Sequence, residues 1–217
     1  MVKPQKDVFW KALVYTIIVF VLGVFAGYLL EESRVNKIND NFQQLLIEWD
    51  DAEAQLNYYQ LLDEDFCDLA IQQNLKFGDE IYQRGLKLEE YESANRFLDE
   101  LDLEKKKYNL LKTKFFISSK TIKEKCDADY EFVFYFYLDT PEFETKEKQR
   151  VVSRVLMDLK YELGDEIILM PLAADMDIGV INILVEKYNV QEYPTVIIKE
   201  NIKITGVHSV DELMEFF

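Results

Sequence analysis

The distribution of apolar residues divides the chain into parts of different character. Residues 12–30 read ALVYTIIVFVLGVFAGYLL, 19 residues without a charge. Residues 31–128 contain no proline and place apolar side chains three and four apart, the spacing of a helix. From residue 129, runs of β-branched and aromatic residues alternate with helical patterns. The pattern predicts a short basic tail at 1–11, a transmembrane helix, a helical region and an α/β domain at 129–217.

The apolar run at 12–30 is long enough to cross a bilayer, whose hydrocarbon core of about 30 Å needs roughly 20 apolar residues. A cleaved signal peptide is the alternative, but the run is long for that purpose and no A-x-A pattern follows it. The positive charges are Lys3, Lys6 and Lys11 before the run, and Arg34 and Lys37 after it. This bias predicts a single-pass membrane protein with a cytoplasmic N-terminus and an extracytoplasmic C-terminal domain.

Two features predict helix packing. Gly23 and Gly27 form a GxxxG motif, which lets two helices approach closely in lipid and would permit a homodimer, although the motif also occurs by chance. A heptad seam of about three repeats surrounds Trp49. Its members are Ile38, Phe42, Leu45, Trp49, Ala52, Leu56 and Tyr59. The seam serves either an intramolecular hairpin that acts as a stalk, or a coiled-coil docking surface for another subunit.

The helical region is predicted to be a hairpin with its turn at KFGD, residues 76–79. Gly78 would end the first helix and Asp79 would cap the second. A bend is predicted near residues 99–102, before the helical pattern resumes at Tyr108.

Composition excludes several kinds of function. The chain carries 25 basic and 41 acidic residues, a net charge of -16, which disfavours binding to nucleic acid phosphates. Two cysteines, Cys67 and Cys126, and one histidine, His208, are too few for a thiol and imidazole metal cluster. The two cysteines are far apart in the sequence and form no CxxC motif. We therefore expect no metal, no cofactor and no catalytic constellation; the alternative is a metal or acid/base site made of carboxylates alone, since no pair stands out among 41 acidic residues.

The last part of the chain predicts the order β-α-β-α-β-β-α. Strands are expected at EFVFYFYL (131–138), EIILMPLAAD (166–175), TVIIK and IKITG, with the first buried on both faces. Thr140 and Pro141 are expected to open the first helix as N-cap and N1 residues. Ser209 begins a capping box for the last helix. The helical connection makes the first two strands parallel, whereas the last two should be antiparallel.

The segment EKYNVQEYPTVII, residues 186–198, resembles the late part of the thioredoxin family. There a helix ends in a turn, and an aromatic or aliphatic residue then precedes a cis-proline, a threonine and an apolar strand. The resemblance covers residues 129–217 and implies a thioredoxin-like fold with a cis bond between Tyr193 and Pro194.

The chain departs from that family where the reactive thiols would stand. The corresponding stretch, residues 139–144, reads DTPEFE and contains no cysteine. We therefore expect a redox-inactive domain that is not an enzyme. The groove beside the cis-proline would remain, where an extended peptide can pair with backbone. The resemblance implies that it is lined by Thr140, Pro141, Tyr193, Pro194 and Thr195; the alternative is that these residues only complete two turns.

Three functions follow from these observations. The first is a membrane-anchored, redox-inactive thioredoxin-like module that binds proteins or peptides as a scaffold or chaperone-like domain, with membrane-associated partner proteins and the bilayer itself as contacts. The second is a structural subunit of a membrane complex, interacting through its stalk and membrane helix. The third is an accessory of thiol–disulfide oxidoreduction that uses Cys67 and Cys126. These cysteines could also form a structural disulfide between hairpin and domain, or stay free.

Overall fold

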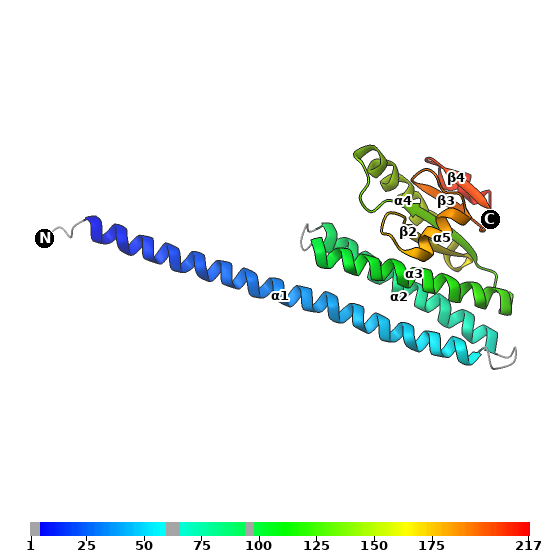
Figure 1. The fold of residues 1–217 in the computed structure, drawn as a ribbon, viewed down its shortest axis with the longest axis horizontal. Helices are drawn as coiled ribbons and strands as arrows, with labels where there is room; N and C mark the ends of the chain where they lie inside the picture. Colours follow the sequence, from blue (N-terminus) through cyan, green and yellow to red (C-terminus); the bar gives the residue numbers. More distant parts are fainter. Residues whose placement is uncertain (1–4, 60–65, 94–97) are drawn as a thin grey trace. The chain divides into compact units, whose positions relative to one another are not determined.

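The computed structural model describes residues 5–59, 66–93 and 98–217, which form six α-helices, one short 3-10 helix and four strands in the described ranges (Figure 1). In chain order the elements are α1 (Gln5–Tyr59), α2 (Cys67–Ser93), α3 (Leu98–Cys126), β1 (Glu131–Tyr137), α4 (Phe143–Leu163), η2 (Gly164–Glu166), β2 (Ile167–Ala173), α5 (Gly179–Lys187), β3 (Thr195–Ile198), β4 (Ile202–Thr205) and α6 (Val210–Met214). They divide into two compact units, Met1–Asp50 and Asp51–Phe217.

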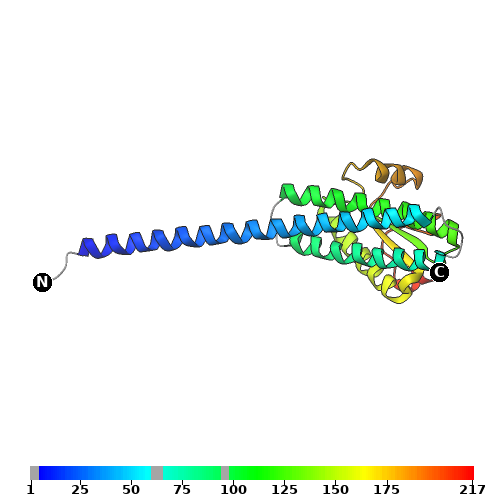
Figure 2. The ribbon, with the colours of Figure 1, turned by 90° about the horizontal axis from the view of Figure 1, so that it is seen from below.

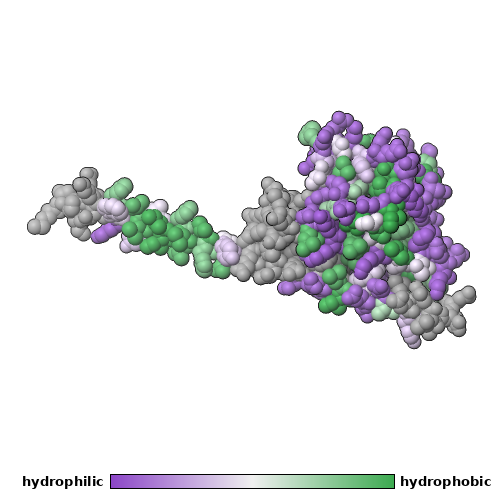
Figure 3. Space-filling view, in the orientation of Figure 1, coloured by the Kyte–Doolittle hydropathy of each residue, from purple (hydrophilic) through white to green (hydrophobic). Residues whose placement is uncertain are grey.

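The first unit contains one segment that is long and apolar enough to span a membrane. Phe9–Leu29 has 21 residues, a mean hydropathy of 2.3 and no buried residues. Figure 3 shows the apolar side chains following one another along this part of α1. A Cβ atom added at Gly23 or Gly27 would meet no atom within 4 Å, and self-association through them stays a prediction. Trp49 is only 3% exposed, while most of its heptad seam lies outside the described side chains.

Helices α2 and α3 lie side by side (Figures 1 and 2). The turn predicted at 76–79 is wrong, because α2 continues through these residues without a break. Gly78 is needed for packing: a Cβ atom there would lie 2.9 Å from Cζ of Phe115 on α3. Gly85 plays the same part opposite Tyr108, whose Cζ would lie 2.9 Å from an added Cβ. These glycines let aromatic side chains of α3 reach the α2 backbone.

The interface of α2 and α3 also contains buried polar groups. Asn74 Nδ2 donates to Ser119 Oγ at 3.0 Å, and both residues are buried. The Tyr108 hydroxyl donates to Ile81 O at 3.0 Å. Such pairs are satisfied in only one register, so they fix how the two helices align. The bend predicted at 99–102 falls within α3, which is helical from Leu98 onward.

The sheet has the strand order β2-β1-β3-β4. Strand β1 is parallel to β2, with Glu131 opposite Ile167, and antiparallel to β3. Strands β3 and β4 are antiparallel. The parallel first pair and antiparallel last pair are those predicted, and the Tyr193–Pro194 bond is cis, as the family resemblance implied. The chain therefore contains an α/β domain with a thioredoxin-like fold.

Two layers of helices cover the two faces of the sheet. On one face, α4 and α6 pack against residues of all four strands. This core comprises Val133, Tyr135, Val152, Leu156, Leu159, Leu163, Ile167, Val196, Ile198, Ile204 and Leu213. The aromatic residues of β1 that point the other way, Phe132 and Phe134, meet Phe116 of α3 edge-on, with ring centroids 5.0 and 4.8 Å away. Helix α3 thus covers a face of the sheet, and we place it with the α/β domain rather than with a separate stalk at 31–128.

Side chains from α3 and α4 also bond the outer edge of β2. Lys160 Nζ donates to Ile167 O at 2.9 Å, Lys112 Nζ donates to Pro171 O, and Asn109 Oδ1 accepts from Ala173 N at 3.2 Å. Ile167, Pro171 and Ala173 are separated by two or four residues, so their backbone groups lie on the same side of β2. This is the side away from β1, because Ala174 N donates to Tyr137 O on the other side. Lys112 is 3% exposed, and burial lowers its pKa to about 7. Pro171 has no N–H to donate, which suits an edge strand.

Candidate partner-binding edge

The predicted groove lies where β1 and β2 end and β3 begins, because these ends meet at one edge of the sheet. Thr140 is exposed, and Pro141 and Tyr193 are partly exposed. Pro194 and Thr195 are buried. The Thr195 hydroxyl donates to Glu192 O at 2.6 Å, so Thr195 stabilises the turn before β3 and does not line an open surface. The accessible part of the predicted groove is therefore Thr140, Pro141 and Tyr193.

Asp175 is a residue that sequence reasoning missed. Its two carboxylate oxygens accept hydrogen bonds from Asp139 N at 2.7 Å, Thr140 N at 3.0 Å and Thr140 Oγ1 at 3.1 Å. Burial by itself would raise the pKa of Asp175, but these hydrogen bonds outweigh it and lower the pKa. Burial, and then the charge of Asp175, raises the pKa of the Tyr193 phenol. Asp175 therefore fixes the loop after β1, and its charge acts on Tyr193 in the turn before β3.

The start of α4 differs from the prediction. Thr140 is not its N-cap and Pro141 is not its first residue, because α4 begins at Phe143 with Glu142 as N-cap and no side-chain cap. Thr140 instead belongs to the loop before the helix, where both its backbone N–H and its hydroxyl donate to Asp175. Phe143 begins the helix with its side chain 81% exposed, beside the loop that Asp175 binds.

Two further side chains fix this loop from the interior. Gln149 of α4 is buried; its Nε2 donates to Leu138 O and its Oε1 accepts from Leu138 N, both at 2.9 Å. Lys105 of α3 forms an ion pair of 2.8 Å with Asp139, and their side chains are 13% and 16% exposed. The loop from 138 to 142 is therefore fixed by α3, by α4 and by Asp175. Such a loop presents Thr140 and Pro141 in one defined arrangement.

The backbone of Tyr193 is the free part of this edge. Phe136 and Thr205 pair with Thr195, the first residue of β3, so the ladder ends there. Among the residues that the structure describes, none forms a hydrogen bond with the N–H or C=O of Tyr193. An exposed backbone of this kind can accept an extended chain by strand addition.

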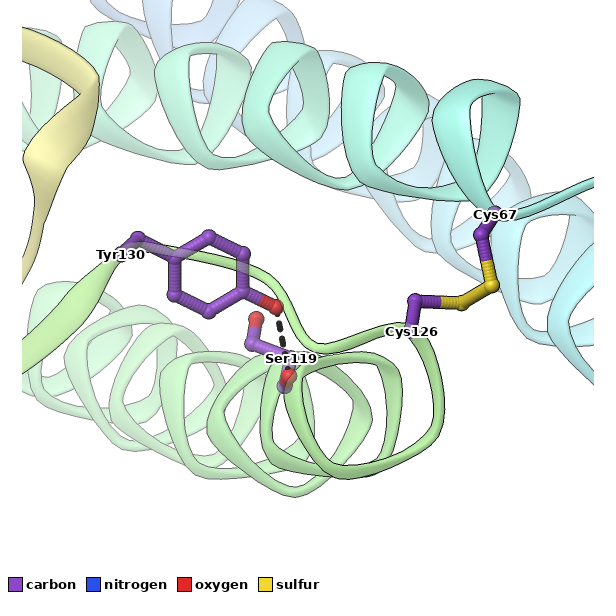
Figure 4. Close-up of a disulfide and its surroundings, with 4 residues drawn as sticks. All are labelled: Cys67, Ser119, Cys126 and Tyr130. Atoms are coloured by element: carbon purple, nitrogen blue, oxygen red, sulfur yellow. Dashed lines mark hydrogen bonds between the residues drawn. A yellow bond between two sulfur atoms is a disulfide. The ribbon is translucent and has the colours of Figure 1, made fainter.

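Cys67 and Cys126 form a disulfide with Cα atoms 5.3 Å apart (Figure 4). It joins the first residue of α2 to the last residue of α3. The predicted pairing of Cys67 with Cys126 is therefore present, and it joins α2 to α3, the helix that covers a face of the sheet. Because a helix rises about 1.5 Å per residue, Cys126 lies roughly 30 Å along α3 from Lys105, which contacts the loop after β1. The disulfide cannot replace the missing CxxC at that loop.

The described residues contain no group of three or more histidine, cysteine, aspartate or glutamate side chains placed to hold a metal ion. The carboxylate of Asp175, at the edge of the sheet, accepts hydrogen bonds from the backbone of Asp139 and Thr140, so its partners come from the protein itself.

We expect Asp175→Asn to lower the free energy of unfolding at neutral pH by about 1 kcal/mol, since it loses hydrogen bonds to a charged acceptor. The folded pKa of Asp175 lies below that of an unfolded aspartate, about 3.9. Its stabilisation is therefore fully present above about pH 4 and is lost as pH falls through the folded pKa. The variant should lose less stability than the wild type on acidification, measured by urea unfolding at a series of pH values.

Asp177→Asn is the matched control, because Asp177 lies two residues away and makes no hydrogen bond to the loop at 138–142 in the described structure. It should keep the wild-type stability and the wild-type pH dependence. Equal behaviour of both variants would show that the charge of Asp175 does not stabilise this loop.

Comparison with known proteins gives the following result. No protein-family model matches the chain, and no curated protein matches it. One solved structure that resembles it is that of chloroplastic thioredoxin z, with 14% sequence identity and a TM-score of 0.34; the match covers 45% of this chain and 84% of that chain. Another is thioredoxin O2 from Arabidopsis thaliana in the oxidized state, with 22% identity and a TM-score of 0.30; the match covers 45% of this chain and 81% of that chain. Similarity at this level says nothing about activity, which we infer only from the residues described above.

Proposed function

We propose that this chain is a membrane-anchored thioredoxin-like protein that binds partner proteins at the edge formed by Thr140, Pro141 and Tyr193 and does not exchange thiols there. The observation that carries the proposal is at Asp175. The loop where the thioredoxin family has its thiols contains none, and its backbone N–H groups bind a carboxylate of the same chain. This arrangement stabilises the loop but supplies no nucleophile.

The binding mode would be strand addition. An extended segment of the partner would hydrogen-bond with the backbone of Tyr193, and side chains on either side of it would contact Pro141 and the exposed Phe143. The fixed loop at 138–142 lowers the cost of binding, since few side chains must be ordered on contact. Partners would be proteins at the same membrane.

The topology proposed is a single span at Phe9–Leu29 with the α/β domain outside the cytoplasm. Two observations support it. Lys3, Lys6 and Lys11 precede the uncharged run at 12–30, whereas only Arg34 and Lys37 follow closely after it. The disulfide between Cys67 and Cys126 is of a kind that persists in oxidising compartments and is rare in the cytosol.

A photo-crosslinking amino acid placed at Tyr193 tests the binding edge. We expect it to crosslink a membrane-associated protein in intact membranes. The crosslinked peptide of that partner should come from an extended segment and not from a helix, because strand addition requires an extended backbone. The same group at Tyr161, which is 87% exposed on α4, is the control and should not capture that protein. Adding Thr140→Arg should lower the yield from position 193 about tenfold by obstructing the edge.

Equal capture from both positions, or capture unaffected by Thr140→Arg, would contradict binding at this edge. Capture of the partner only from a crosslinker at Ile47, which is 69% exposed on α1, would favour the alternative of a structural subunit that interacts through its stalk and membrane helix.

The disulfide favours a second candidate, an accessory of thiol–disulfide oxidoreduction. Both cysteines are partly exposed, which thiol exchange requires. Under this alternative, a mixed disulfide with a second protein should accumulate in a Cys126→Ser variant and should be lost in Cys67→Ser/Cys126→Ser. Non-reducing electrophoresis of membranes after acid quenching detects such adducts. Their absence in Cys126→Ser and also in Cys67→Ser would exclude this candidate.

A further inference from the structure

The two ends of the Cys67–Cys126 disulfide differ in the number of other contacts that fix them. At the Cys126 end, the Tyr130 hydroxyl donates to Ser119 O at 2.6 Å, as Figure 4 shows. Lys123 Nζ donates to Tyr130 O and forms an ion pair of 3.1 Å with Glu131. The corner between α3 and β1 is therefore fixed by its own hydrogen bonds and ion pairs, whether or not the disulfide is present.

Within residues 67–73 of the described structure, the Cys67 end has few such contacts. Within residues 67–73, Ala70 is the only buried residue, at 4% exposure. Leu69 is 42% exposed, although it is apolar. The first side-chain hydrogen bond from α2 to α3 in the described structure is that of Asn74 to Ser119. In the described structure, the buried side chain of Ala70 and the disulfide are thus the anchors of almost two turns of α2.

We propose that the disulfide is a site of reduction by a dithiol protein, and that its reduction releases residues 67–73 of α2 while α3, β1 and the rest of the sheet keep their structure. Both cysteines are partly exposed, so an incoming thiolate can reach the bond. This proposal differs from the oxidoreductase alternative, because the disulfide is here the substrate of another protein and does not act on one. It is also independent of binding at Tyr193.

The reaction balances as two exchanges. A thiolate of the dithiol protein attacks one sulfur, breaks the Cys67–Cys126 bond and forms a mixed disulfide, while the other cysteine leaves as a thiolate and takes up a proton. The second thiol of the dithiol protein then loses its proton and attacks the mixed disulfide. Two electrons and two protons reach the cysteines, and the dithiol protein becomes a disulfide. Cys67 then lies at the start of a helix segment with one buried anchor, Ala70.

Hydrogen exchange measured by mass spectrometry on the full chain in detergent micelles tests the proposal, with dithiothreitol as the reducing dithiol. We expect amide exchange in 67–73 to become at least about tenfold faster on reduction, because the segment opens locally. Peptides covering 119–137 should keep their rates. The variant Cys67→Ser/Cys126→Ser should show the fast rate in 67–73 with and without dithiothreitol.

Three results would overturn the proposal. Unchanged exchange in 67–73 on reduction would show that Ala70 and its neighbours suffice to position this end of α2. Faster amide exchange in 67–73 and in 119–137 together would show that the disulfide stabilises the whole unit Asp51–Phe217 and not one end of α2. A disulfide that dithiothreitol cannot reduce in the folded chain, judged by alkylation and mass measurement, would exclude it as a substrate.

Discussion

Replacing Phe116 with alanine is expected to lower the free energy of unfolding by about 3–5 kcal/mol, the usual cost of removing a buried aromatic side chain. Phe116 is 7% exposed, and its ring contacts those of Phe132 and Phe134 edge-on. The loss would leave a cavity between α3 and the sheet. Urea unfolding of the detergent-solubilised chain, followed by circular dichroism of the helices and by tyrosine fluorescence, measures the effect.

Ile117→Ala is the control, because Ile117 is the next residue on α3 and is 54% exposed. We expect it to change stability by no more than about 0.5 kcal/mol. Phe116→Ala should shift both spectroscopic signals together, since α3 and the sheet share one core. Separate transitions, with the sheet unfolding as in the wild type, would show that α3 does not belong to the domain.

Gly85→Ala is expected to destabilise the chain by about 1–3 kcal/mol, as overpacking of a well-packed interface does. An added Cβ would lie against the hydroxyl of Tyr108 and 2.9 Å from its Cζ. Tyr108 has little freedom to move, because its hydroxyl donates to Ile81 O and its ring lies 4.6 Å from the Lys112 amine. Thermal unfolding of Gly85→Ala beside the wild type measures the cost.

The double variant Gly85→Ala/Tyr108→Phe makes this prediction specific. Tyr108→Phe alone should cost about 1 kcal/mol through the lost hydrogen bond to Ile81 O. It also removes the atom closest to the new Cβ, so the two changes together should cost less than their sum. Gly179→Ala is the control, since a Cβ there meets no atom within 4 Å. Strict additivity at Gly85 and Tyr108 would mean that the contact does not set the cost.

The order of the sheet elements could be predicted because each has a strong local signal. After Glu131 the residues of β1 are all apolar or aromatic, which predicts burial on both faces, and five of its seven residues are buried. Ser209 and Glu212 form the capping box that their spacing predicts. The place of α3 had no such signal, because its apolar residues fit a hairpin as well as a sheet. Gly78 was misleading, since a glycine that ends a helix and one that admits an aromatic ring look alike in sequence.

Of the candidate site, the sequence predicted the local geometry only at the cis-proline, where a motif marks it. The sequence around Tyr193 and Pro194 has a family pattern, and the cis bond lies there. Asp175 has none: its partners Asp139 and Thr140 are 36 and 35 residues away in the chain. The same holds for the pairing of Cys67 with Cys126, because a sequence gives no distance between two helix ends.

The bonds from Lys160, Lys112 and Asn109 to the outer side of β2 have a consequence for contacts between copies of the chain. An edge strand with free N–H and C=O groups is a template for further strands and a starting point for aggregation. On β2 three of these groups are already bonded, and Pro171 lacks an N–H. Growth of the sheet by another copy is thereby blocked on the β2 side. Copies of the chain that lie close together can therefore remain separate, without joining their sheets along this strand.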